Sequence, residues 1–435
     1  MRQLASRLAS NSLVRNAAML YGAQVGRKVL PLLVIPYLAR TLGPSGWGLV
    51  AFAQSLGEFI VLIIEFGFSL SATRAIARNR ESKEACAGIA AGVLGAQALL
   101  AMTGIAAATF VARWVPALHE QPRLLVAALF YAVAQGMTPL WLFQGLERMQ
   151  LAVTLEISGR LIGLALLFLF VHSPADGWKA LLIQGVAPGV STVAGLLLVY
   201  RELPWRRPRW SSTRDALAEG WRMFVFRSAE SLYGVGNAFI LGLFASQAQV
   251  GYFASAEKIS KAAFGLLNPI REALYPRLSS LVQGSRQSAV RLARIGILVM
   301  IAGGLVLGAF LFFTAPLLIR LLMGQAFAPA VVVLRILSVL PPTLSVTYSV
   351  GLQWLLPLGR DAEVNKIILL AGCLNLVLAT CLAPSLGHIG MAGSIVCAEL
   401  FVAISMVRVV VRSTTLLHRS ETDAELSTQL ANPVN

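Results

Sequence analysis

Long apolar stretches recur along the whole chain and restrict the possible folds more than any other feature. Each is about 20 residues long, the length that an α-helix needs to cross the roughly 30 Å hydrocarbon core of a bilayer. Only 13% of the residues are charged, against about 25% in soluble proteins. The sequence therefore predicts an all-α, polytopic membrane protein. We place twelve transmembrane helices at residues 17–38, 47–70, 86–111, 124–144, 152–171, 180–200, 220–245, 250–275, 295–316, 328–354, 364–384 and 388–407.

The basic residues between these stretches predict how the chain is oriented. Cytoplasmic loops of membrane proteins are enriched in Lys and Arg. If the N-terminus lies inside, the only basic residues in outer loops are Arg40, Arg113, Arg123, Lys179 and Arg320. We therefore predict that both termini are cytoplasmic. The cytoplasmic loops then account for the formal net charge of +16, and no nucleic-acid partner is expected.

A basic, hydrophilic segment at residues 201–219 is the longest polar connection between spans. It predicts an N-terminal six-helix bundle at 1–200, a cytoplasmic linker at 201–219, a C-terminal six-helix bundle at 220–412 and a polar cytoplasmic tail at 413–435. Because both halves begin inside, any internal repeat should be parallel. At an offset of 203 residues, Gly48, Ala51, Ala53 and Arg74 match Gly251, Ala254, Ala256 and Arg277. Four matches among mostly small residues do not establish a repeat by themselves.

Sequence patterns of catalysis and metal binding are absent. The chain has no GxxxxGK[ST] phosphate-binding loop, no HExxH motif and no CxxC pair. Its predicted outer loops are short, whereas membrane enzymes that act on lipid-linked sugars usually need a larger outer loop or an acidic metal-binding motif. We therefore predict that the chain is not an enzyme, and we expect no catalytic residue, no metal and no cofactor.

Basic residues inside the spans are the strongest candidates for binding residues. A charge at the bilayer centre costs roughly 2.5–3.5 kcal/mol on insertion scales, so it needs a partner, a water-filled cavity or access to the interface. Ion pairing is one explanation, because Glu156–Arg160 and Glu257–Lys261 have the i,i+4 spacing of intrahelical pairs. The other is a basic cavity between the two bundles that binds an anionic group. We predict that this cavity is lined by Arg27, Lys28, Arg227, Lys258 and Lys261.

Carboxylates inside the spans are candidates for ion coupling, because burial favours the neutral form of a carboxyl group. A group that gains and loses a proton during transport could link cargo movement to a proton gradient. Structural pairing is an equally good explanation for each of these residues. The candidates are Glu58, Glu65, Glu230 and Glu399.

Short sequence stretches also carry a family resemblance. They are PLL at 31–33, PYL at 36–38, RTLGP at 40–44, FAQ at 52–54, EFGF at 65–68, SAT at 71–73, WLFQG at 141–145, LNPI at 267–270 and YPR at 275–277. In order and spacing they resemble the O-antigen flippases, the Wzx-type exporters of the multidrug/oligosaccharidyl-lipid/polysaccharide superfamily. The resemblance extends from about residue 15 to about residue 410.

The resemblance implies two bundles of six helices that open alternately to either side of the bacterial inner membrane. The implied cargo is an oligosaccharide repeat unit on undecaprenyl pyrophosphate, moved from the cytoplasmic to the periplasmic leaflet. Implied protein partners are the O-antigen polymerase and the chain-length regulator. Two alternatives remain open: a drug or metabolite exporter of the same superfamily, and a membrane polymerase or ligase of the same glycan.

Overall fold

The computed structural model describes the backbone of residues 2–268, 286–355 and 360–431. It describes the side chains of residues 34–221, 223–224, 234–268, 295–351, 355, 360 and 362–411. Most of the described residues are helical, and none of them lies in a strand. The predicted all-α fold is therefore confirmed.

The helices follow one another with short connections. The first half contains α1 (Arg2–Glu65), α2 (Phe68–Arg78), α3 (Lys83–Ala112), α4 (Pro116–His119), α5 (Pro122–Gly136), α6 (Leu140–Gly145), α7 (Met149–Phe170), the 3₁₀ turn η1 (Pro174–Asp176) and α8 (Gly177–Tyr200). The second half contains α9 (Trp210–Gly234), α10 (Asn237–Phe244), α11 (Gln247–Gly265), α13 (Arg286–Leu322), the 3₁₀ turn η2 (Gln325–Phe327), α14 (Ala330–Leu337), α15 (Leu340–Thr347), the π-helix η3 (Tyr348–Leu355) and α16 (Asp361–Ala431).

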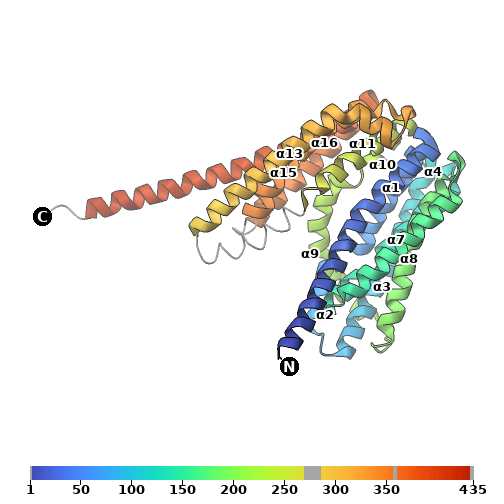
Figure 1. Ribbon diagram of the computed structural model, residues 1–435, viewed down its shortest axis with the longest axis horizontal. Coiled ribbons are helices and arrows are strands. Elements are labelled where there is room, and N and C mark those ends of the chain that lie inside the picture. Colours follow the sequence, from blue (N-terminus) through green and yellow to red (C-terminus); the bar gives the residue numbers. More distant parts are fainter. Residues whose placement is uncertain (1, 269–285, 356–359, 432–435) are drawn as a thin grey trace.

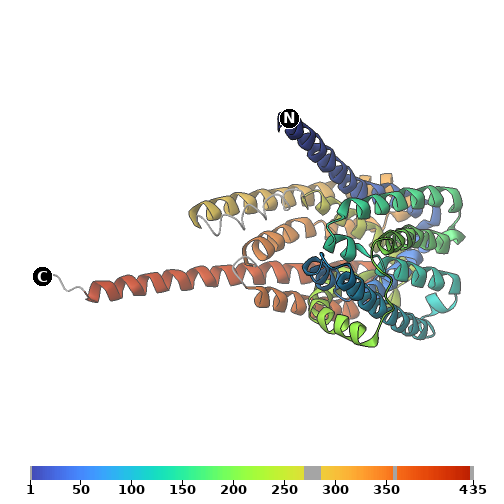
Figure 2. The same ribbon diagram turned by 90° about the horizontal axis from the view of Figure 1, so that it is seen from below.

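The helices form two arms that diverge from a common end of the molecule (Figure 1). Helices of the first half, blue to green, gather in one arm, whereas α13 and the long α16 extend into the other (Figure 2). Helix α9 connects the arms because it packs against both α3 and α16. It begins at Trp210, inside the predicted linker, and its residues Ser212 and Thr213 lie against glycines of α3.

Within the part of the chain that the structure describes, eight helical stretches are long and apolar enough to span a membrane. Two of them, Val34–Arg78 with 45 residues and Ala362–Val411 with 50, are longer than one crossing needs. The first is broken at Gly43, with φ 67°, and the second at Gly387, with φ 54°. Glycine tolerates these positive φ values because it has no Cβ. Both breaks fall where the sequence predicts one span to end and the next to begin, and the number of twelve helices stays a prediction.

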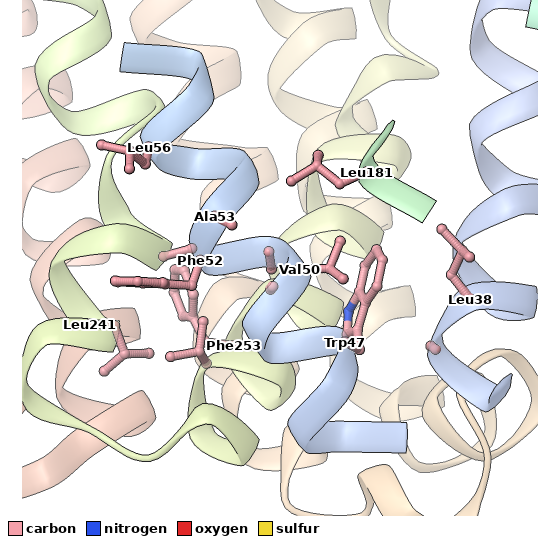
Figure 3. Packing of buried hydrophobic residues seen from close by; sticks show 14 of the residues in the cluster. Leu38, Trp47, Val50, Phe52, Ala53, Leu56, Leu181, Leu241 and Phe253 are labelled. Atoms are coloured by element: carbon pink, nitrogen blue, oxygen red, sulfur yellow. The ribbon is translucent and has the colours of Figure 1, made fainter. Parts of the chain in front are cut away.

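The common end of the two arms, which we call the vertex, is formed by residues 44–52 of α1 and 247–254 of α11. Apolar side chains from both halves are buried together there (Figure 3). Trp47, Val50 and Phe52 of α1 are at most 1% exposed, as are Leu241 of α10 and Phe253 of α11. Burial of a large apolar side chain contributes about 1.5–3 kcal/mol, so this cluster holds the two halves together at the vertex.

Two glycines bring the backbones of α1 and α11 into direct contact at the vertex. A Cβ atom on Gly48 would lie 1.8 Å from the carbonyl oxygen of Gln247, and one on Gly251 would lie 2.1 Å from the carbonyl oxygen of Pro44. Both positions therefore require glycine for this packing. Gly48 and Gly251 are also a matched pair at the 203-residue offset. Matched positions of the two halves thus face each other, as expected of a two-fold relation between the halves.

A polar contact adds to the vertex. The Arg40 guanidinium donates a hydrogen bond to the carbonyl oxygen of Leu321, near the C-terminal end of α13. A cation is favoured beside the unpaired carbonyls at this end of a helix. Two residues of the RTLGP segment therefore contact the second half of the chain. Arg40 bonds to the carbonyl of Leu321, and the carbonyl of Pro44 lies against Gly251.

An ion pair joins the start of α7 to the end of α8 at the opposite, predicted cytoplasmic, edge. Arg148 and Glu202 lie 2.5 Å apart and are both about half exposed. The hydrogen bond from Arg148 lowers the pKa of Glu202. Any stabilisation by the pair is therefore present above the ordinary Glu pKa of about 4.3 and is lost as the pH falls through the lowered pKa.

Exposed ion pairs of this kind contribute little to the stability of a protein. We expect Glu202→Gln to change the Tm of the purified protein at neutral pH by at most about 2 °C; a larger drop would show that the pair matters.

Candidate functional site

A cavity of about 280 Å³ lies between helices of the first half and α11 of the second. We call it the lysine cavity. Among its described lining residues, Lys258 is the only one from the second half. Its polar lining is Gln54 from α1, Tyr131 and Gln135 from α5, Arg160 from α7, Gln184 from α8 and Lys258 from α11. The cavity therefore lies where the two halves meet.

The direct partners of the Lys258 ammonium group are neutral. Its Nζ donates a hydrogen bond to Oε1 of Gln54 at 3.2 Å and lies 5.0 Å from the centre of the Trp47 ring. Nε2 of Gln54 in turn donates to Oε1 of Gln184 at 3.3 Å. Amide oxygens and an aromatic face stabilise a cation without neutralising it. Lys258 therefore has no ion-pair partner among the described residues, although the carboxylates of Glu58 and Glu257 attract it at longer range.

Lys261, a second basic residue predicted for the cavity, is placed differently from Lys258. Lys261 forms an ion pair with Glu257 at 3.0 Å, donates to the carbonyl oxygen of Gly234 at 3.0 Å and is 56% exposed. It does not line the lysine cavity. The side chains of Arg27, Lys28 and Arg227 lie outside the described residues.

A second cavity, of about 290 Å³, lies beside the first and within the first half of the chain. We call it the amide cavity. It shares Gln135, Arg160, Ala187 and Pro188 with the lysine cavity. The rest of its polar lining is Glu65, Ser69, Gln97, Thr138, Trp141, Glu156 and Ser191. The predicted pair Glu156–Arg160 is confirmed, with 2.9 Å between the charged atoms, and it faces the amide cavity.

The carboxylates predicted for ion coupling occupy separate places. Glu58 accepts a hydrogen bond from the hydroxyl of Tyr131, a lining residue of the lysine cavity. Glu65 lines the amide cavity. Glu399 is buried in α16, with 3% of it exposed. The side chain of Glu230 lies outside the described residues. Among the three described carboxylates, Glu58 is therefore linked by a hydrogen bond to a lining residue of the cavity that contains Lys258.

Uncharged polar residues make up much of both cavities, and a search restricted to charges misses them. Gln54, Gln135 and Gln184 line the lysine cavity, and Gln97 lines the amide cavity. All four lie within predicted spans. A buried amide without a hydrogen bond costs roughly 1–3 kcal/mol, so glutamines in apolar spans were a usable signal for these cavities.

Comparison with known sequences agrees with the resemblance. Residues 13–282 match the family of polysaccharide biosynthesis proteins. The chain is 33% identical over 408 residues to the "Putative O-antigen transporter" of Escherichia coli strain K12, and the match covers 93% of this chain and 98% of that protein. The protein of the same name from Shigella dysenteriae is 28% identical over 399 residues, which cover 91% of this chain and 99% of the relative.

Comparison with solved structures identifies the fold. An inward-facing multidrug resistance MATE family transporter of the MOP superfamily superimposes with a TM-score of 0.64 and 17% identity, covering 90% of this chain and 99% of that one. The lipid II flippase MurJ in an inward closed conformation gives a TM-score of 0.69 at 10% identity, covering 91% and 87% of the two chains. The fold is therefore that of the MATE and MurJ proteins. On the sequence match, the chain belongs to the polysaccharide biosynthesis protein family and, within it, to the O-antigen transporters.

Proposed function

We propose that this protein is a flippase for an O-antigen repeat unit, or a similar polysaccharide repeat, linked to undecaprenyl pyrophosphate. It moves this cargo from the cytoplasmic to the periplasmic leaflet of the bacterial inner membrane and is not an enzyme. Relatives named as O-antigen transporters support the class of cargo. The observation that carries the proposal is the position of Lys258, a cation of the second half that enters a polar cavity of the first.

The pyrophosphate of the cargo is the ligand that we assign to Lys258. Charge-assisted hydrogen bonds are about twice as strong as neutral ones, and the partners of Lys258 within the protein, Gln54 and Trp47, are neutral. Arg27, Lys28 and Arg227 are proposed as further members of this site. A positive site would repel an organic cation, which argues against a drug exporter for such compounds.

The arrangement of the two arms supports a route for the cargo. The arms meet at the vertex, which contains the predicted outer ends of the helices, and diverge toward the predicted cytoplasmic side (Figure 1). We propose that this form accepts cargo from the cytoplasmic leaflet. Separation of residues 44–52 from residues 247–254 would then open the site to the periplasm, as rocking of two bundles does in other transporters.

The side of the membrane on which cargo accumulates tests the function. Cells depleted of this protein should build up undecaprenyl-pyrophosphate-linked repeat units in the cytoplasmic leaflet, while surface polysaccharide falls. The two leaflets can be distinguished with a membrane-impermeant sugar-oxidising reagent added to right-side-out and to inverted vesicles. Loss of a polymerase or ligase would instead leave the sugars in the periplasmic leaflet, so labelling mainly in right-side-out vesicles would contradict the proposal.

We further propose that a carboxylate couples cargo movement to protons, with Glu58 as the first candidate and Glu65, Glu230 and Glu399 as the others. Glu58 is bonded to Tyr131, a wall residue of the lysine cavity, so a change in its protonation would alter the cavity directly. We expect Glu58→Gln to remove the pH dependence of flipping in inverted vesicles. Tyr131→Phe, which deletes only the hydroxyl, should shift this dependence without removing it. Unchanged pH dependence in all four Glu→Gln variants would exclude coupling by these residues.

A further inference from the structure

We propose that the amide cavity binds the uncharged sugars of the cargo, beside the cation that takes the pyrophosphate. This inference rests on the proposed flippase function and adds a second subsite to it. The two subsites are adjacent because Gln135, Arg160, Ala187 and Pro188 form part of the wall of both cavities. Each cavity is close to 300 Å³, the lower end of the range for small-ligand sites, so together they have room for more than the pyrophosphate.

The charges in the amide cavity do not suit a second anion. Its basic lining residue, Arg160, is paired with Glu156 at 2.9 Å. Glu65 adds another acidic group to the wall. A pyrophosphate placed here would meet carboxylates, whereas it would meet the neutral partners of Lys258 in the adjacent lysine cavity. Because the two cavities differ in charge in this way, we assign the pyrophosphate of the ligand to the lysine cavity and its uncharged sugars to the amide cavity.

The hydrogen-bonding groups of the wall match sugar hydroxyls. A hydroxyl group both donates and accepts, and so does the amide of a glutamine. Gln135, which faces both cavities, is half-buried, and its side chain makes no hydrogen bond to another described residue. Ser191 and Thr138 add hydroxyl groups to the same wall. The wall thus offers donors and acceptors together, with Gln135 placed between the two subsites.

Buried polar atoms in this wall also lack protein partners. Gln97 is 1% exposed and donates through Nε2 to the carbonyl oxygen of Gly136 at 3.0 Å, but its Oε1 has no partner among the described residues. Trp141, 3% exposed, likewise has no partner for its Nε1 there. An unmet buried group costs roughly 1–3 kcal/mol, and small side-chain rotations toward a bound sugar would satisfy one donor and one acceptor.

Aromatic rings complete the site. Phe68, Trp141 and Phe143 line the amide cavity together with its amides and hydroxyls. Each face of a sugar ring carries C–H groups, which pack on apolar surface, while the hydroxyls at the rim need polar partners. A wall that combines aromatic rings with amide groups offers both kinds of contact, which an ion site or a purely apolar lipid groove would not.

Binding to the purified full-length protein in nanodiscs separates the two subsites. The probes are undecaprenyl pyrophosphate without sugar, the same lipid carrying the repeat unit extracted from the host cells, and the delipidated repeat oligosaccharide. We expect the wild type to bind the sugar-bearing lipid at least about tenfold more tightly than the bare lipid. Gln135→Leu and Trp141→Phe should each reduce this preference at least about threefold. Trp141→Phe should leave the affinity for the bare lipid unchanged, because Trp141 lines the amide cavity and not the lysine cavity. Binding of the delipidated oligosaccharide should be weak but lost in the same variants, because the sugars then bind alone.

Gln150→Leu is the matched control, because Gln150 is exposed at the start of α7 and lines neither cavity. It should bind all three probes like the wild type. Equal affinity of the wild type for bare and sugar-bearing lipid would overturn the inference while leaving the flippase proposal intact. A Gln135→Leu/Trp141→Phe double variant that keeps the sugar preference would do the same. Failure of the wild type to bind either lipid would instead reject the flippase proposal, and this inference with it.

Discussion

Replacement of Gly48 by alanine is expected to reduce flipping at least tenfold. The new Cβ would lie 1.8 Å from the carbonyl oxygen of Gln247 and 2.6 Å from the backbone nitrogen of Gly251. Both are backbone atoms and cannot rotate away, so α1 and α11 would have to separate. Overpacking of this kind costs typically 1–3 kcal/mol. If transport requires the closed vertex as one of its states, a cost of about 2 kcal/mol lowers the population of that state roughly 30-fold.

A second glycine provides the control for this substitution. A Cβ on Gly88 in α3 meets no atom within 4 Å, so Gly88→Ala makes the same chemical change without a clash. It should flip cargo at the wild-type rate. Gly251→Ala, whose Cβ would lie 2.1 Å from the carbonyl oxygen of Pro44, should reproduce the Gly48→Ala defect. If Gly48→Ala and Gly88→Ala flip equally well, closure of the vertex is not needed for transport.

The state of the vertex can be measured directly in the same variants. Phe52 lies in the buried vertex cluster and is 1% exposed (Figure 3). A cysteine placed there in a cysteine-free background should react slowly with a membrane-impermeant thiol reagent added from the periplasmic side. The Gly48→Ala change should speed this reaction, because it separates α1 from α11. Unchanged labelling would show that the helices accommodate the methyl group.

Lys258→Ala is expected to lower the rate of flipping by about 10- to 100-fold. A hydrogen bond to a charged group contributes roughly 1.5–3 kcal/mol, and every 1.4 kcal/mol corresponds to a factor of ten. Lys258→Arg keeps the charge and should retain part of the activity, since the cavity must then fit a larger group. The loss should appear in cells as lipid-linked repeat units that remain on the cytoplasmic face.

Lys261 gives a matched control for this prediction because it lies one turn further along α11. It is paired with Glu257 and is 56% exposed. Its intrahelical pair contributes only about 0.3–0.5 kcal/mol, so Lys261→Ala should flip cargo at close to the wild-type rate. If Lys261→Ala is as defective as Lys258→Ala, or if Lys258→Ala is active, Lys258 is not the anion-binding group.

The helices could be predicted from the sequence because a bilayer accepts few alternatives. A polar backbone can cross the hydrocarbon only with its hydrogen bonds satisfied within the segment, so each apolar stretch of sufficient length had to be helical. The join at Gly43 also agrees with the predicted gap between the first two spans. The contact of Gly48 with Gly251 could be anticipated only as a weak match between the halves, since sequence identity does not state that matched positions touch.

The composition of the site was harder to predict, because it depends on how several helices pack. Lys258 and Lys261 are three residues apart and belong to one helix face, yet their long side chains reach different partners. Lys258 bonds to Gln54, whereas Lys261 contacts both Glu257 and the carbonyl oxygen of Gly234. Arg160 forms the ion pair predicted for it and also lines both cavities. Gln135 carries no charge, so a search for charged residues within the spans missed it, and the packing of α5, α7 and α8 reveals that it faces two cavities.

Flipping by the purified protein is the most direct test of the central claim. The protein is reconstituted into liposomes with undecaprenyl-pyrophosphate-linked repeat units, and the sugars in the outer leaflet are oxidised with an impermeant reagent. With wild-type protein, the inner-leaflet sugars should become reactive over time, and they should do so at least tenfold more slowly with Lys258→Ala. In liposomes that contain Lys261→Ala, the rate should be close to that of the wild type. Sugars that remain protected in intact wild-type liposomes, with the protein folded and inserted, would contradict a flippase.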